Sequence, residues 1–221
     1  MIQAVSALQI PGKEISILLA SMARETEIAV DCAIDSLLTF SERSAGRVFE
    51  KEQLINQTEM AIDQKVFTTL KAGHLTGPEV RSVVLVLKMN KDLERVGDLA
   101  TSIARRVMYI AAKHGKLDWS ELQPMAIAVS HVCRQTLRAL TRRDLVLAKN
   151  AVSTGQSVTA YRDYVFNRLC NQMERPVQKE AVSLMLASRS LEQIANHAGN
   201  VAENLILFLG GPEAEPEQLA S

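Results

Sequence analysis

Residues 92–100 have the sequence DLERVGDLA, and residues 190–198 repeat it in weakened form as SLEQIANHA. At the offset that relates the two copies, 98 residues (192 minus 94), Leu93 matches Leu191 and Glu94 matches Glu192. Apolar residues fall at helical spacing in both copies. In a chain of 221 residues, a period this long predicts two copies of one helical unit rather than a short-period solenoid.

Charge and hydropathy limit the kinds of partner. The chain has 25 Lys plus Arg against 25 Asp plus Glu, so no net charge draws it to nucleic acid or to an anionic membrane. No apolar run approaches the roughly 20 residues that a membrane span needs, and the amino terminus does not resemble a signal peptide. We therefore expect a cytoplasmic protein that meets a membrane only through its partners.

Three cysteines, Cys32, Cys133 and Cys170, lie far apart among helical apolar residues. Their spacing fits neither a zinc site nor a redox couple. We expect them to be reduced and buried as small apolar side chains.

The apolar periodicity predicts six helices and no strands, over residues 13–41, 47–72, 78–114, 119–140, 143–173 and 176–209. The fifth is expected to be broken near Gly155, since glycine inside a helix costs about 1 kcal/mol relative to alanine. The fold class is therefore all-α, with two tandem three-helix bundles.

A glycine at position 115 ends the third predicted helix and sets the boundary between the halves. Residues 1–116 form the first predicted bundle and residues 117–210 the second, with Trp119 expected to anchor the junction. The acidic, proline-containing tail over residues 211–221 has no apolar face and is expected to be disordered.

Two acidic pairs lie one helical turn apart. Glu94 and Asp98 share the shoulder of the third predicted helix, where like charges repel unless a cation lies between them. Gly97 removes a side chain beside them, which lets another backbone or an ion approach. Glu59 and Asp63 repeat the spacing on the preceding helix, where Glu59 falls among the apolar residues Ile55, Ile62, Val66 and Leu70.

A carboxylate removed from water costs several kcal/mol unless it gains a partner or changes its pKa. On neighbouring antiparallel helices the two pairs could offer up to eight oxygens to a hard cation or a multinuclear cluster. Spacing alone leaves another interpretation open, in which Glu94 and Asp98 are solvated or bridged to Lys91, Arg95 or Arg105. Similar acidic rows are common on solvated faces, as at residues 27, 31 and 35 of the first predicted helix.

Other candidate functional residues are few. His74, His114 and His131 have no companion at metal-ligand spacing and are expected at the surface or at helix ends. His197 lies one position beyond the match of Asp98 in the second copy. The sequence has neither a glycine-rich phosphate loop nor a nucleophile elbow, so an enzyme is disfavoured. A carboxylate-bridged metalloenzyme remains a remote alternative, because its usual Glu-x-x-His pairs do not occur.

Residues 92–100 resemble the repeated signature of the PhoU family of phosphate-transport regulators, which reads approximately L-E-R-I-G-D-H-A. The pair Glu59 and Asp63 resembles the family's acidic pair on the preceding helix. The second copy resembles the same signature followed by N-I-A-E, through Glu192, His197, Ala198, Asn200, Ala202 and Glu203. The likeness covers nearly the whole chain.

This resemblance implies two three-helix bundles related by a pseudo-twofold axis, with multinuclear metal sites at acidic pairs in some members. It also implies a regulator without catalysis that restrains phosphate uptake and phosphate-starvation signalling. The implied partners are the ATPase subunit of the phosphate ABC importer and the phosphate sensor histidine kinase, with homo-oligomerisation left open. An alternative is a related regulator of a different carrier, such as a sodium-phosphate transporter.

The second copy departs from the signature. Gln193, Ala195 and Asn196 replace the expected Arg, Gly and Asp, and the matching pair on the fifth predicted helix reads Asp163 and Asn167. In the first copy, residue 99 is Leu where the family usually has His. We therefore expect any divalent or trivalent metal, of the iron or zinc type, to bind in the first half, with a second-half site weakened or absent. Its predicted ligands are Glu59, Asp63, Glu94 and Asp98.

Overall fold

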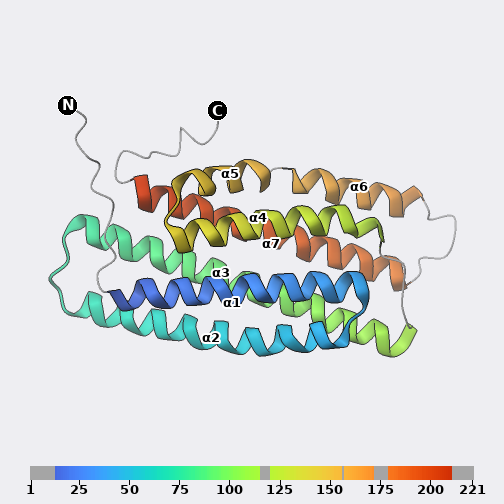
Figure 1. Ribbon diagram of the computed structural model, residues 1–221, viewed down its shortest axis with the longest axis horizontal. Helices are drawn as coiled ribbons and strands as arrows, with labels where there is room; N and C mark the ends of the chain where they lie inside the picture. The colour runs from blue at the N-terminus through green and yellow to red at the C-terminus, as the bar shows by residue number, and fades with distance from the viewer. Residues whose placement is uncertain (1–12, 115–119, 156, 172–178, 211–221) are drawn as a thin grey trace.

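The computed structural model describes residues 13–114, 120–155, 157–171 and 179–210, and every regular element in these parts of the chain is a helix. The helices are α1 (Lys13–Thr39), α2 (Glu42–Lys71), α3 (Gly77–His114), the 3-10 helix η1 (Ser120–Leu122), α4 (Gln123–Arg142), α5 (Leu145–Gly155), α6 (Val158–Asn171) and α7 (Lys179–Gly210). Figure 1 shows α1, α2 and α3 side by side along one long side of the molecule and α4 to α7 along the other. The prediction of an all-α protein with two helical bundles is confirmed.

Local sequence signals explain where these helices begin and end. Ser41 caps α2, because its Oγ accepts a hydrogen bond from the Ser44 backbone N–H at 3.1 Å, so this helix starts before the predicted residue 47. At the start of α3, the Glu79 carboxylate accepts bonds from the Thr76 backbone N–H at 2.8 Å and from its hydroxyl at 2.7 Å. The fifth predicted helix is divided after Gly155 into α5 and α6.

Some expectations fall outside the described residues. These are the boundary between residues 116 and 117, Trp119, the start of the last predicted helix at Pro176, and the tail over residues 211–221. The side chains of His114 and Cys170 are also outside them.

The core runs through both bundles. The apolar stripe of α3 is at most 2% exposed and consists of Leu93, Val96, Ala100, Ile103, Ala104 and Val107. These side chains belong to one hydrophobic cluster that also includes residues of α4 and α7. Burying a large apolar side chain contributes about 1.5–3 kcal/mol, so packing of this stripe stabilises α3 more than helix propensity does. Cys32 and Cys133 are free and buried, as expected.

Two helix pairs join the bundles, α3 with α7 and α1 with α4. Along the α1–α4 seam, Arg134 Nη2 lies 2.9 Å from Asp31 Oδ2, and Arg138 Nε lies 3.8 Å from Glu27 Oε1. The acidic row of the first helix is therefore paired across the bundles rather than simply solvated. Asp35, the third member of that row, instead accepts a hydrogen bond from the Ser44 hydroxyl near the start of α2.

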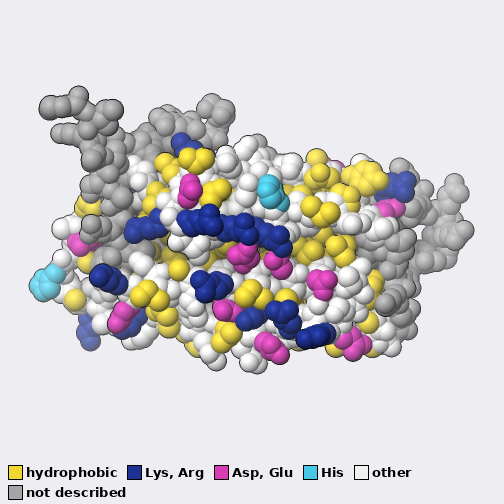
Figure 2. Space-filling view, viewed as in Figure 1, with side chains coloured by type: hydrophobic (Ala, Val, Ile, Leu, Met, Phe, Trp, Pro, Cys, Tyr) yellow, Lys and Arg dark blue, Asp and Glu magenta, His cyan; other side chains and the backbone are white. Residues whose placement is uncertain are grey.

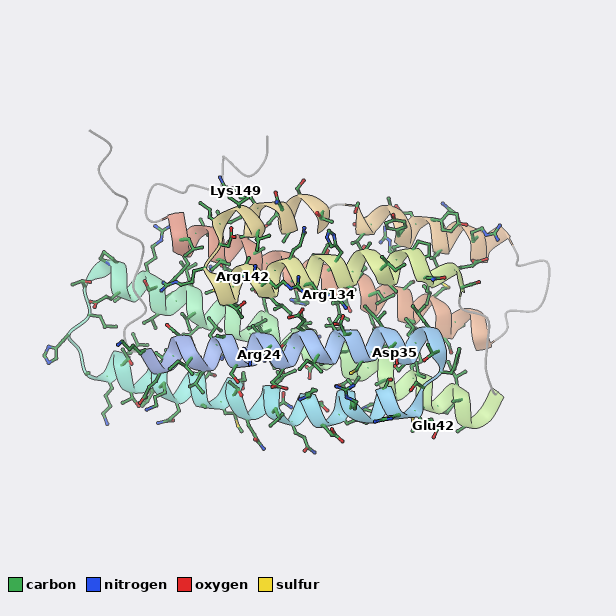
Figure 3. The ribbon with its side chains drawn as sticks, viewed as in Figure 1. Arg24, Asp35, Glu42, Arg134, Arg142 and Lys149 are labelled. Atoms are coloured by element: carbon green, nitrogen blue, oxygen red, sulfur yellow. The ribbon has the colours of Figure 1, made fainter. Side chains whose placement is uncertain are left out.

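The basic side chains of α4 form a surface row. Figure 2 shows Lys and Arg side chains crossing this face over α4, with acidic side chains next to them on the α1 side. Figure 3 labels Arg134 and Arg142 on α4 and Arg24 on α1. None of the described helices combines the length and the apolar character that crossing a membrane requires.

Candidate functional site

Helices α2 and α3 lie against each other and place the four predicted acids on one side of their contact. The approach is close because Gly97 has no side chain: a Cβ there would lie 3.0 Å from Ile55 Cδ1 and 3.4 Å from its Cγ2. Gly97 thus makes room beside α3, and the fully buried Ile55 side chain lies in that space. The sequence predicted the space but expected a backbone or an ion to approach there.

A lysine lies between the two acidic pairs. Lys91 Nζ is 2.8 Å from Glu94 Oε2 and 4.0 Å from Glu59 Oε1, so one ammonium group connects α3 to α2. Asp98 is paired with its own helix, through Arg95 Nη1 at 3.5 Å from Oδ2. The predicted neighbours Lys91 and Arg95 are therefore present, whereas Arg105 pairs with Glu52 at 3.8 Å.

The fourth acid is held by a buried amide. Asn90 Nδ2 donates to Asp63 Oδ1 at 2.9 Å and to the Glu59 backbone carbonyl at 3.2 Å, so this side chain fastens α2 to α3. Asn90 is 1% exposed. Sequence reasoning missed this residue, although a signal exists. Asn90 lies on the helical spacing between the buried residues Val86 and Leu93, where an amide needs an internal partner.

Burial and neighbouring carboxylates raise the pKa values of two of the four acids. Burial, followed by the charges of Asp63 and Glu94, raises the pKa of Glu59, while Lys91 opposes the shift. Burial and the Glu94 charge likewise raise the pKa of Asp98, against the effect of Arg95. The hydrogen bond to Glu94 is the main cause of a raised Lys91 pKa. The four carboxylates also outnumber Lys91 and Arg95, the basic side chains paired with them.

The donor chemistry of these four residues suits a hard cation, since all the candidate ligands are carboxylate oxygens. Their arrangement is not yet a coordination set. In the parts of the chain that the structure describes, no three His, Cys, Asp or Glu side chains converge closely enough to hold a metal ion. Metal binding here would require Lys91 to move aside and the two acidic pairs to draw together.

The corresponding region of the second half, beside α6 and α7, has a different charge pattern. Arg162 contacts two acids, with Nη1 3.5 Å from Glu192 Oε1 and Nη2 2.5 Å from Asp163 Oδ1. Asn167 is exposed, and so is Asn196, which the 98-residue offset matches to Asp98. Where the first half has a lysine and four carboxylates, this region therefore has arginine, two carboxylates and two amides.

His197 connects the two halves. Its Nδ1 lies 2.9 Å from Asp92 Oδ1, and Asn200 Nδ2 donates to the same oxygen at 3.3 Å, so two α7 side chains meet one carboxylate of α3. The sequence indicated that His197 was unusual but gave no partner, because the contact depends on how the bundles dock. His74 and His131 are exposed, as expected.

A family model described as the PhoU domain matches residues 19–107 and again residues 122–205. The chain belongs to the PhoU family. The two matched stretches contain the two copies of the signature, so both copies are PhoU sequence.

Curated PhoU homologues resemble the chain over most of its length. It is 28% identical over 198 residues to a phosphate-specific transport system accessory protein PhoU homolog of Pseudomonas putida, covering 88% of this chain and 77% of the relative. It is 25% identical over 194 residues to PhoU homolog 1 of Thermotoga maritima, covering 81% of this chain and 78% of the relative.

Solved PhoU structures have the same helical arrangement. The crystal structure of PhoU from Pseudomonas aeruginosa superimposes with a TM-score of 0.83 at 27% identity and covers 90% of this chain and 97% of that one. PhoU from Streptococcus pneumoniae superimposes with a TM-score of 0.78 at 19% identity, covering 91% and 96%. The second likeness concerns the fold alone.

Proposed function

We propose that this chain is a cytoplasmic, non-enzymatic regulator that restrains phosphate uptake and phosphate-starvation signalling. The supporting observation is the PhoU domain matched twice on an all-helical framework, together with relatives named as accessory proteins of the phosphate-specific transport system. The proposed partners are the ATPase subunit of the phosphate ABC importer and the sensor histidine kinase.

The proposed mechanism is selection among partner conformations. An adaptor that binds one state of a transporter or kinase more tightly than another shifts the population toward that state. Two bundles joined by the helix pairs α1–α4 and α3–α7 suit this role, because the surface of such a body keeps one shape while its partners change theirs. The paired charges along the α1–α4 seam and the Asp92–His197 contact support such a body.

The experiment is a deletion of the gene in cells grown with ample phosphate, read out by a phosphate-starvation promoter. We expect the promoter to become active and the intact gene to restore repression. Unchanged promoter activity would contradict the regulatory role. Purification of the tagged protein together with membrane proteins from the same cells identifies the transporter subunit or kinase that it binds. Recovery of a sodium-phosphate carrier instead of the ABC importer would favour the alternative regulator of another transporter.

We also propose that Glu59, Asp63, Glu94 and Asp98 are the ligands when the protein binds iron or zinc. The support is their shared face and their oxygen chemistry, together with the burial and the neighbouring carboxylates that raise the pKa values of Glu59 and Asp98. Protein purified without chelator should contain metal, and a Glu94→Ala, Asp98→Ala variant should contain much less. A Lys91→Met variant should retain at least as much metal as the parent. Equal metal content in the parent and the double variant would refute the assignment.

A further inference from the structure

Helix α6 lies along the first part of α7, and Figure 1 shows the two helices at one end of the second bundle. Between them is a hollow of about 560 Å³, lined by side chains of both helices. This volume falls within the range of about 300–1,000 Å³ that is typical of pockets for small organic ligands. None of its lining residues belongs to the acidic cluster of the first half.

Two arginines line this hollow, and only one of them contacts an acid within the described parts of the chain. Arg162 is engaged by Glu192 and Asp163, and both acids also line the hollow. Arg189 lines it from α7, and within the described parts of the chain this side chain has no acidic partner. A planar guanidinium with several parallel N–H groups is well suited to bind a phosphate, often with two hydrogen bonds at once.

The rest of the lining adds two further kinds of contact. Gln193 and Asn196 bring amide groups to the same side of the hollow as Arg189, one and two turns further along α7. Phe166 brings an aromatic ring from α6 that is 48% exposed. An exposed ring on the wall of a hollow can stack on a planar ligand group, and the amides can donate to its oxygens.

Comparison of the two halves supports an anion rather than a cation. The 98-residue offset matches Arg189 to Lys91 and Asn196 to Asp98. In the first half the lysine is neutralised by Glu94 at 2.8 Å. In the second half the matching Glu192 is taken by Arg162, so the matching arginine keeps its charge available.

We propose that the hollow between α6 and α7 binds a small organic phosphate that carries a planar ring. The phosphate group bonds to Arg189 with help from Gln193 and Asn196, and the ring stacks on Phe166. A free inorganic phosphate would fill little of the hollow and would leave the aromatic wall uncovered. The site is separate from the predicted metal ligands, and the inference does not depend on the proposed regulatory role.

The test is titration calorimetry on the full chain with the four common nucleoside monophosphates as probes. Three fragments serve as controls. Adenosine has the planar ring without the phosphate, whereas ribose 5-phosphate and inorganic phosphate have the phosphate without the ring. At least one nucleotide should bind about tenfold or more tightly than any of these three fragments, since each fragment loses one group of contacts. Absence of binding by all four nucleotides at millimolar concentration would overturn the proposal, as would equal binding by inorganic phosphate.

Variants assign the binding to this hollow. Arg189→Ala should weaken the best nucleotide by about 10-fold to 100-fold, in keeping with the loss of charge-assisted hydrogen bonds. Arg189→Lys should recover part of this loss, and Phe166→Ala should weaken the nucleotide but not ribose 5-phosphate. The control is Arg142→Ala. It removes an exposed arginine that lies on α4, outside the hollow, and should leave binding unchanged. Equal losses in the Arg189 and Arg142 variants would overturn the proposed location. Circular dichroism of each variant confirms that it is folded.

Discussion

The two halves have similar apolar stripes and different polar surroundings. In the first half, Lys91 lies among carboxylates that exceed its charge. In the second half, Arg189 has no acidic partner among the described residues and lies beside an acid that Arg162 contacts. The difference shows which positions packing restricts. The stripe must fill a core in both halves, whereas the shoulder of the helix can carry either sign of charge without changing the fold.

The largest expected effect tests whether the halves share one core. Leu93 and Leu191 are matched by the repeat and both are fully buried. We expect Leu93→Ala and Leu191→Ala each to lower the free energy of unfolding by about 2–5 kcal/mol, from lost burial and the cavity left behind. Urea denaturation followed by circular dichroism measures it. Because α3 packs on α7, each variant should still unfold in a single transition. Two separate transitions would show that the halves are independent.

The second prediction compares Asn90 with Ser188, which the repeat also matches. Asn90 connects two helices, whereas within the described parts of the chain the Ser188 hydroxyl donates only to the Met185 carbonyl of its own helix, at 2.8 Å. Asn90→Ala should cost about 2 kcal/mol, because a buried donor with two acceptors is lost. Ser188→Ala should cost about 0.5 kcal/mol or less. The measurement is again urea denaturation, and equal losses would contradict the role given to Asn90.

The third prediction concerns Gly97, where the second half has the buried Ala195. Gly97→Ala should destabilise the protein by about 1 kcal/mol. The new Cβ crowds Ile55 Cδ1, and the free-energy cost of this contact exceeds the gain in helix propensity from glycine to alanine. Ile55→Val removes that Cδ1 atom. In the Ile55→Val background, Gly97→Ala should therefore become stabilising. A thermal denaturation double-mutant cycle measures the coupling, and purely additive effects would refute the contact.

The smallest expected effect is a pH dependence confined to the first half. The folded protein raises the pKa of Glu59, so this carboxylate begins to lower stability as pH rises through the ordinary acid pKa and has its full effect above the folded pKa. In chelator-treated protein, Glu59→Gln should therefore stabilise by about 0.5 kcal/mol at neutral pH, with the gain fading as pH falls toward the ordinary value.

The matched control is Glu192→Gln, which removes an acid that faces Arg162 and should give no stabilisation at neutral pH. Melting temperatures across a pH series separate the two variants. A pH-independent gain in Glu59→Gln would mean that ionisation of the buried Glu59 carboxylate is not its cause.

The sequence predicted what depends on local spacing. The helical stripes follow from periodicity along single helices, and so does the one-turn spacing within each acidic pair, Glu59 with Asp63 and Glu94 with Asp98. Contacts between helices were harder to predict. The Asp31–Arg134 pair joins residues 103 apart, and the register that brings them together is set by docking of whole helices.

The candidate site shows the same division. Its four acids were predicted, and so was the space beside Gly97, but not the side chain that fills it. Asn90 was missed because one amide within an apolar stripe has little effect on the pattern of the helix. The hollow beside Arg189 was also missed, because it depends on how α6 lies against α7 and because Arg162 occupies the acid that would otherwise neutralise Arg189.

The division of α5 from α6 has a consequence for how the second bundle opens. Helix α2 is continuous over 30 residues and buries five apolar side chains, whereas α6 has 14 residues and, among its described side chains, buries only Val158 and Val165. Elements with few buried contacts exchange their amide hydrogens through local opening, well before the whole protein unfolds. Amides of α6 should therefore exchange faster than those of α2. Such opening would let a ligand enter the hollow beside Phe166 while the α1–α4 and α3–α7 contacts between the bundles stay intact.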